Sequence, residues 1–101
     1  MITGKWKMVL HSPMGDKNVV FDANTTETGL EGEFSNDSGW SANIYEGSAD
    51  GESFKFKVDF PVPGMGSFTF TLTGSVEGDS MAGVAKMAVG KCKFEADRIT
   101  Q

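Results

Sequence analysis

The sequence has little of the chemistry on which many small proteins depend. It contains one cysteine, Cys92, and one histidine, His11, among 101 residues. A single cysteine excludes an internal disulfide framework, and one cysteine with one histidine cannot supply a Cys/His zinc motif. Gly64-Met65-Gly66 does not open a helical pattern, so it is not a dinucleotide-binding loop. We therefore expect no metal centre and no cofactor.

Basic residues and long apolar runs are also scarce. Nine Lys and Arg face fourteen Asp and Glu, which gives a net charge of −5 and an isoelectric point near 4.7. This charge is unfavourable for binding nucleic-acid phosphates or an anionic membrane, so we expect neither partner. No apolar stretch approaches the length that spans a bilayer. The chain runs into Gly4-Lys5-Trp6 without a cleavable apolar region, so we expect a cytoplasmic protein.

The dominant pattern in the sequence is alternation of apolar and polar residues. In residues 52 to 60, a Phe or Val occupies every second position, which places these side chains on one face of a strand. Residues 67 to 73 and 91 to 98 repeat the pattern, and clusters of Gly, Pro, Asn and Asp separate such runs. The sequence predicts about eight hairpin-connected strands, near residues 4 to 11, 17 to 24, 29 to 35, 39 to 46, 52 to 60, 66 to 75, 80 to 88 and 91 to 99.

The seventh of these strands is the least distinct, because residues 80 to 88 also carry a helical apolar stripe and several alanines. We favour a strand because residues 28 to 34 and 78 to 84 share one pattern: a turn, a large apolar residue, any residue and then glycine. That pattern places Gly32 and Gly83 on the inner face. A glycine there is typical of a bend at a barrel corner.

Eight short antiparallel strands either close into a barrel or expose two edges. For a single domain over residues 1 to 101, a closed up-and-down β-barrel hides the most backbone, and a two-sheet sandwich is the alternative. In the ambiguous fourth strand we place the apolar set inside, Trp40, Ala42 and Ile44, rather than Ser41, Asn43 and Tyr45. Parity gives the remaining interior as Trp6, Met8, Leu10, Val19, Phe21, Ala23, Leu30, Gly32, Phe34, Phe54, Phe56, Val58, Phe60, Phe68, Phe70, Leu72, Met81, Gly83, Met87, Cys92, Phe94, Ala96 and Arg98.

Gly4-Lys5-Trp6 at the start and Arg98 at the end of the chain resemble the calycin superfamily, the avidins and lipocalins. In that superfamily the first strand begins with Gly-x-Trp, and the last strand carries an Arg packed against the Trp. The resemblance implies structural roles for Trp6 and Arg98, with the guanidinium over the indole face as a cation–π contact. Residues 29 to 34 also resemble the third strand of avidins.

The resemblance does not extend to the ligand positions of avidins. Met8 and Phe34 stand where avidins carry a polar Asn and Tyr, and the later tryptophans of the biotin site are absent. We therefore expect no biotin binding.

One end of the predicted barrel gathers the loops at residues 12 to 15 and 61 to 66, which share Pro, Met and Gly. Flexible methionines are suited to an apolar rim, so we expect an apolar or amphipathic small molecule to bind at this mouth. The alternative is that phenylalanines fill the core completely. The expected ligand-binding residues are Met14, Met65, Trp40, Phe56, Phe70 and His11.

The opposite end gathers acidic loop residues, Glu27, Glu46, Asp50, Glu52, Glu77 and Asp79, for which we expect solvation rather than Ca²⁺ binding, since no EF-hand loop is present. Two further functions stay open. A cofactor-free isomerase, cyclase or lyase acting on a hydrophobic substrate would use His11, Cys92 or Tyr45 for proton transfer. A self-associating module with a packed core would use the outward Thr69, Thr71 and Thr73 as a flat β surface. We expect a homo-oligomer.

Overall fold

A computed structural model describes residues 2–12, 15–27, 29–37, 39–62, 66–88 and 90–99, and every regular element among them is a β-strand. The strands are β1 (Gly4–Ser12), β2 (Gly15–Thr26), β3 (Gly29–Ser35), β4 (Ser41–Asn43), β5 (Tyr45–Asp50), β6 (Ser53–Val62), β7 (Gly66–Glu77), β8 (Ser80–Met87) and β9 (Gly90–Arg98). The described residues contain no helix long and apolar enough to cross a membrane.

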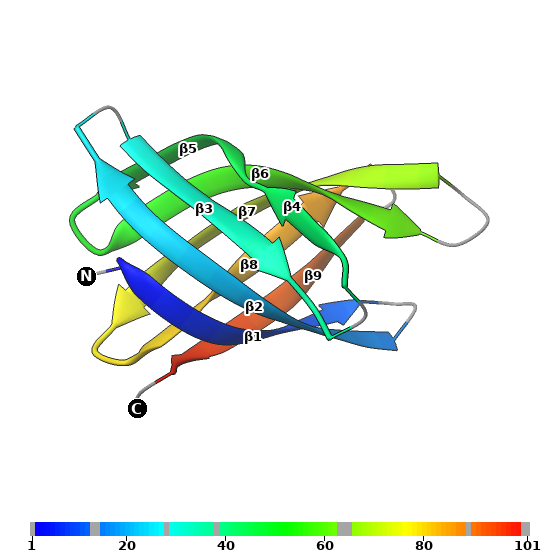
Figure 1. Cartoon of the computed structure of the whole chain (residues 1–101), viewed down its shortest axis with the longest axis horizontal. Helices are drawn as coiled ribbons and strands as arrows, with labels where there is room; N and C mark the ends of the chain where they lie inside the picture. Colours follow the sequence, from blue (N-terminus) through cyan, green and yellow to red (C-terminus); the bar gives the residue numbers. More distant parts are fainter. Residues whose placement is uncertain are drawn as a thin grey trace.

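The strands form an antiparallel barrel that closes on itself (Figure 1). Consecutive strands pair along the chain, except that β4 and β5 both pair with β3, and β9 returns to pair with β1, with Trp6 opposite Arg98. The predicted all-β, up-and-down barrel is therefore confirmed. Residues 80 to 88 form a strand and not a helix, as the repeated glycine pattern predicted.

The predicted fourth strand is divided. It forms β4 and β5, which both pair with β3 and are separated by Ile44, and the pairing of β5 with β6 shifts register between Tyr45 and Ser48. Glu46 has a φ of 50°, which marks the irregularity. The barrel therefore has eight strand positions around its circumference, and β4 and β5 together occupy one of them. The choice of the apolar face is confirmed, since Ile44 is buried and Tyr45 is exposed.

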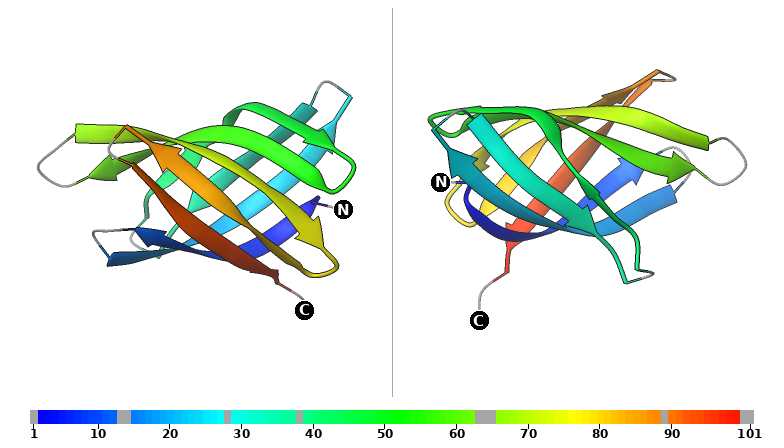
Figure 2. Two further views of the ribbon diagram at one scale, coloured as in Figure 1. Left: turned by 180° about the vertical axis from the view of Figure 1, so that it is seen from behind. Right: turned by 45° about the horizontal axis from the view of Figure 1, so that its top comes forward.

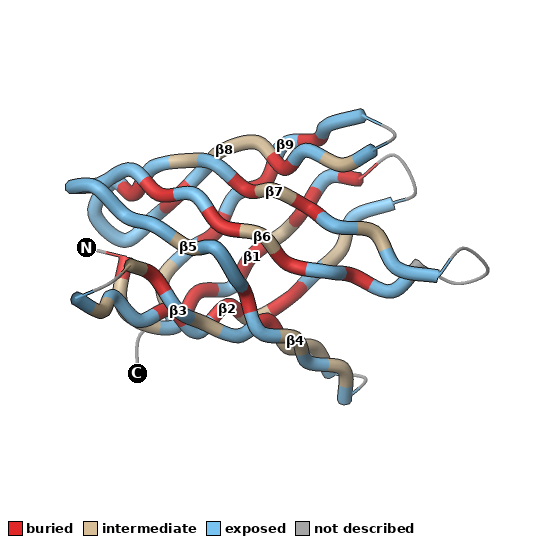
Figure 3. Tube along the Cα trace, turned by 90° about the horizontal axis from the view of Figure 1, so that it is seen from above, coloured by how far each residue is buried: buried red, intermediate tan, exposed pale blue. Residues whose placement is uncertain are grey.

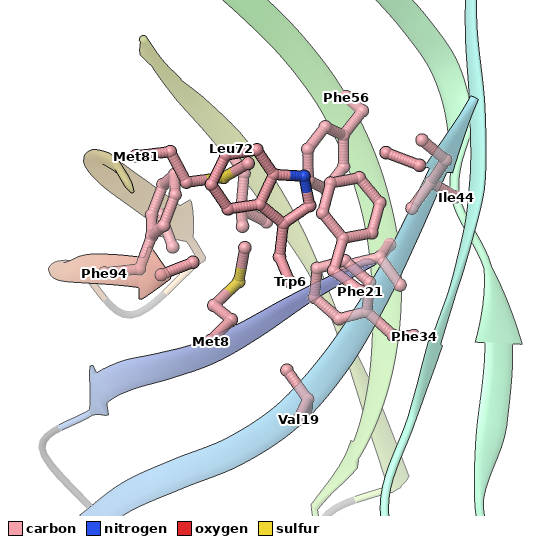
Figure 4. Close-up of a cluster of buried hydrophobic side chains, with 14 of the residues drawn as sticks. Trp6, Met8, Val19, Phe21, Phe34, Ile44, Phe56, Leu72, Met81 and Phe94 are labelled. Atoms are coloured by element: carbon pink, nitrogen blue, oxygen red, sulfur yellow. The ribbon is translucent and has the colours of Figure 1, made fainter. Parts of the chain in front are cut away.

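Burial alternates along the strands, as the tube in Figure 3 shows. Inward side chains fill the interior, where phenylalanine rings contact one another with centroids 4.9 to 6.2 Å apart. Figure 4 shows Trp6, Met8, Phe21, Phe56 and Phe94 converging on the same volume. Burial of apolar surface on this scale stabilises the fold. The interior is packed with side chains.

Inward glycines allow the strands to bend around this core. A Cβ at Gly83 would clash with the Thr73 backbone oxygen and lie 2.7 Å from the Gly74 Cα and 2.9 Å from the Phe94 ring. A Cβ at Gly32 would lie 2.6 Å from the Asp22 backbone oxygen. Real Cβ atoms do not approach so closely, so only glycine fits at these two bends. The predicted role of Gly32 and Gly83 is confirmed.

Candidate functional site

The two ends of the barrel carry different sets of turns. One end, which we call the closed end, holds the turns after β2, β5 and β7 and the start of β1. The other, which we call the mouth, holds the connections after β1, β3, β6 and β8. Figure 2 shows both ends in side view. The sequence predicts ligand binding at the mouth.

At the closed end, Arg98 covers Trp6. The Arg98 Cζ lies 4.3 Å from the centroid of the Trp6 ring, and Arg98 Nη1 donates a hydrogen bond of 2.8 Å to the Thr3 carbonyl. Arg98 Nε donates to Asp79 at 3.0 Å. The fully buried Trp6 donates its own Nε1–H to the Ile2 carbonyl at 2.8 Å. The expected cation–π contact is present, and these bonds fix both of its members.

The start of β1 requires a glycine at position 4. Its φ is 136°, a value that side chains with a Cβ rarely adopt, and a Cβ there would lie 2.7 Å from Arg98 Nη1. The glycine thus leaves room for the guanidinium beside Trp6. Gly4, Trp6 and Arg98 form one structural unit, in which Trp6 is fully buried.

At the mouth, Trp40 lies half-buried against the core. Its ring stacks on Phe60, with centroids 5.0 Å apart and an interplanar angle of 28°. Asn36 makes two hydrogen bonds with the main chain of Trp40. The Asn36 N–H donates to the Trp40 carbonyl at 3.1 Å, and Asn36 Oδ1 accepts from the Trp40 N–H at 3.2 Å. These two bonds close the connection between β3 and β4 and set the position of the indole.

A hollow of about 200 Å³ opens beside this stack. Trp40, Phe60 and Pro61 form apolar walls, while Lys17 and Asn36 contribute polar groups. The volume is below the range of about 300 to 1,000 Å³ that is usual for drug-sized ligands. The hollow therefore has room for one ring or a short chain, and the rest of a larger ligand would extend out of it over the rim. The lining thus contains both an aromatic side chain, Trp40, and a cationic one, Lys17.

The other expected binding residues lie in different places. Phe56 and Phe70 are fully buried. Phe70 packs edge-on against Phe60 at 4.9 Å, beneath the hollow and not in its lining. Met14 and Met65 lie outside the described residues, so the expected methionine rim stays a prediction. The contribution of Trp40 to the wall of the hollow could be read from the sequence, whereas that of Lys17 could not.

His11 lies on the outer face of β1, away from the hollow. Its Nδ1 is 3.2 Å from Asp16 Oδ1, and its Nε2 is 3.2 Å from Glu95 Oε1. The hydrogen bonds with Glu95 and then Asp16 raise the pKa of His11 above its ordinary value of 6.5. A neutral imidazole has one N–H and can donate to only one carboxylate, whereas the imidazolium donates to both. When protonated, His11 thus links β2, β1 and β9 through ion pairs with Asp16 and Glu95.

The three groups considered for proton transfer do not converge. Cys92 is buried in the interior, and burial raises the pKa of its thiol, which disfavours the reactive thiolate. His11 lies on the outer surface. Tyr45 is also outside and donates its hydroxyl to Asp59 at 2.8 Å. These positions give no shared site for acid–base chemistry among the three.

The acidic loops at the closed end are dispersed. Asp79 pairs with Arg98 and Glu46 pairs with Lys57. Within the part of the chain that the structure describes, no three His, Cys, Asp or Glu side chains are grouped so that they could hold a metal ion.

Comparison with known proteins identifies no relative: the chain matches no protein family, no curated protein and no solved structure. The site therefore has to be interpreted from its own geometry.

Proposed function

We propose that this protein binds a small amphipathic molecule, with a flat apolar part and an anionic group, in the hollow at the mouth. The observation that carries the proposal is the half-buried Trp40 ring, stacked on Phe60 and forming the wall of that hollow. A flat apolar group would stack on the indole, and the Lys17 ammonium would attract the anionic group. Because the interior is packed, the ligand would lie at the rim and not in the core.

The two hydrogen bonds of Asn36 favour a ligand-binding role for Trp40 over that of an ordinary exposed side chain. They hold the Trp40 main chain in place before any ligand arrives, and a site that is already ordered loses less conformational entropy on binding. An exposed aromatic ring without such support would give up more entropy for the same contact.

The proposal is tested with two related fluorescent probes, the anionic 1-anilinonaphthalene-8-sulfonate and the neutral N-phenyl-1-naphthylamine. We expect both probes to brighten on titration with the wild-type protein, and Trp40→Ala to abolish this. Lys17→Gln should weaken binding of the anionic probe several-fold and leave the neutral probe unchanged. Far-UV circular dichroism checks that each variant is folded.

Tyr45→Ala is the matched control, because Tyr45 is one of the exposed large apolar residues and does not line the hollow. This variant should bind both probes as the wild type does. Probe binding that survives Trp40→Ala, or that Tyr45→Ala removes, would contradict the proposal. Native mass spectra of the protein as purified add an independent test, since a retained ligand raises the mass and is lost on denaturation.

We also propose that the barrel is calycin-like, as the sequence resemblance suggests. The support is the arrangement of Gly4, Trp6 and Arg98 at the closed end, with the arginine over the indole. The cytoplasmic location expected from the sequence stays a prediction.

A further inference from the structure

The charges of this acidic protein are separated between two sides of the barrel. Outward lysines on β6, β8 and β9 form a basic face, which consists of Lys55, Lys57, Lys86, Lys91 and Lys93. The strand register places them in two rows. Lys57, Thr71, Lys86 and Lys91 are successive cross-strand partners, and Lys55, Thr73, Val84 and Lys93 form the neighbouring row.

The basic face is largely unneutralised. Lys57 pairs with Glu46 at 3.2 Å, whereas no ion pair among the described residues engages Lys86, Lys91 or Lys93. Lys86 and Lys91 are direct cross-strand partners. Like charges directly opposite each other destabilise a sheet. The repulsion between Lys86 and Lys91 therefore disfavours the folded state of a single chain.

The opposite side of the barrel carries the reverse charge. Asp22 on β2 and Glu31 and Glu33 on β3 point outward and form an acidic face, beside a hollow of about 530 Å³. Asp22 and Glu33 are also direct cross-strand partners of like charge, and Lys5 on β1 is the partner of Asp22 on its other side. Strands β3, β4 and β5 contain no Lys or Arg. Figure 1 shows β2 and β3 toward the viewer, and the view from behind in Figure 2 shows β8 and β9.

This arrangement changes the expectation for Thr69, Thr71 and Thr73. The sequence suggested a flat, uncharged surface on which two copies could stack face to face. In the structure, Lys57 and Lys86 flank Thr71, and Lys55 is the partner of Thr73 on β6. Thr69 instead pairs with Asp59 and donates a hydrogen bond to its carboxylate. Two such faces brought together would place lysine against lysine, so a symmetric contact through this surface is unfavourable. A contact between opposite faces has the required complementarity.

We propose that copies of this chain associate head to tail, with the basic face of one copy on the acidic face of the next. The contact would relieve both like-charge pairs, Lys86 with Lys91 and Asp22 with Glu33. Because each copy keeps one free face of each sign, association can continue beyond two chains. Exposed ion pairs are screened by salt, so the assembly should form at low ionic strength and dissociate at high ionic strength. This proposal is independent of ligand binding at the mouth.

Two variants that each lose one face test the proposal by complementation. One is K86Q/K91Q/K93Q, which keeps the acidic face, and the other is D22N/E31Q/E33Q, which keeps the basic face. In sedimentation velocity at an ionic strength of about 0.02 M, we expect the wild type to grow in mass from micromolar to millimolar concentration. Each variant alone should remain at the mass of one chain, 10.8 kDa.

The decisive sample is the equimolar mixture of the two variants. It has one intact face of each sign, so it should form a two-chain complex that grows no further and that dissociates in about 0.5 M salt. K5Q/K7Q/K17Q removes the same number of positive charges outside the basic face, and because Lys5 is the cross-strand partner of Asp22, this variant should associate at least as strongly as the wild type does. Circular dichroism confirms that each variant is folded.

The proposal is overturned if the wild type stays monomeric over the whole concentration range, or if the folded variants fail to combine. It is also overturned if K5Q/K7Q/K17Q loses association as fully as K86Q/K91Q/K93Q. A monomeric wild type that binds heparin through Lys86, Lys91 and Lys93 would likewise overturn it, in favour of a polyanionic partner for the basic face.

Discussion

Replacing Arg98 with alanine tests the closed end of the barrel most directly. The substitution removes the guanidinium from above Trp6, where its Cζ lies 4.3 Å from the ring centroid. It also removes the hydrogen bond to the Thr3 carbonyl and the ion pair with Asp79. The Arg98 side chain is 21% exposed, so most of its contacts are shielded from water.

The expected loss can be estimated contact by contact. A cation–π contact at a largely buried site is worth about 1 kcal/mol. The charged hydrogen bond to Thr3, at a partly buried position, adds about 1 kcal/mol. The Asp79 carboxylate is 77% exposed, so this ion pair contributes at most about 0.5 kcal/mol. We therefore expect Arg98→Ala to lower the free energy of unfolding by about 2 kcal/mol, or the Tm by roughly 10 °C.

Urea unfolding followed by circular dichroism measures this difference at equilibrium. Asp79→Asn is the matched control, because it removes the ion pair and leaves Arg98 over the indole; we expect a loss below about 1 kcal/mol. If Arg98→Ala stays within about 0.5 kcal/mol of the wild type, as an ordinary surface substitution does, the reasoning about the closed end is refuted. The proposed calycin-like character of the barrel would lose its support as well.

Two other predictions follow from the barrel itself. Gly83→Ala would drive a Cβ against the Thr73 backbone oxygen and the Phe94 ring, so it should destabilise the protein by about 3 kcal/mol or more in urea unfolding. A loss no larger than the ~1 kcal/mol expected for Gly78→Ala, at an open turn position with a φ of 63°, would contradict the tight bend. The second prediction concerns His11, whose folded pKa is raised above the unfolded value of 6.5. Its stabilising contribution is fully present below about pH 6.5 and is lost as the pH rises through the folded pKa. The wild type should therefore exceed His11→Gln in unfolding free energy by more at about pH 5.5 than at about pH 8.5, and a constant difference would refute the pairing with Asp16 and Glu95.

Much of the fold could be predicted because alternation reports directly on which side chains face a core. The strand that contains Phe54 and Phe56 is a clear case, since its inward residues are uniformly apolar and its outward ones are mainly charged. The break at Ile44 could not be predicted in the same way. The break depends on how β4 and β5 pair with β3 and on the positive φ of Glu46, and neither feature produces a periodic pattern of residues in the sequence.

The candidate site was predicted only in part. The sequence indicated the mouth and included Trp40, because an inward aromatic near a loop is typical of a rim. It could not show that Phe56 and Phe70 would be fully buried, with Phe70 packed against Phe60, since parity gives the face of a residue but not its depth. The contribution of Lys17 was missed for a related reason. A lysine at the end of a strand is ordinary in sequence, and only the fold brings it to the same hollow as Trp40.

The sequence by itself determined an all-β chain of about eight hairpin-connected strands, because period-two patterns are separated by short turns, and it favoured a closed barrel over a two-sheet sandwich. It also placed Trp6 opposite Arg98, since the first and last strands of such a barrel are neighbours. The tertiary structure alone decided that the interior is full and that charge is divided between two faces. Both properties depend on packing and register between strands distant in sequence, and a net charge of −5 gives no sign of a basic face.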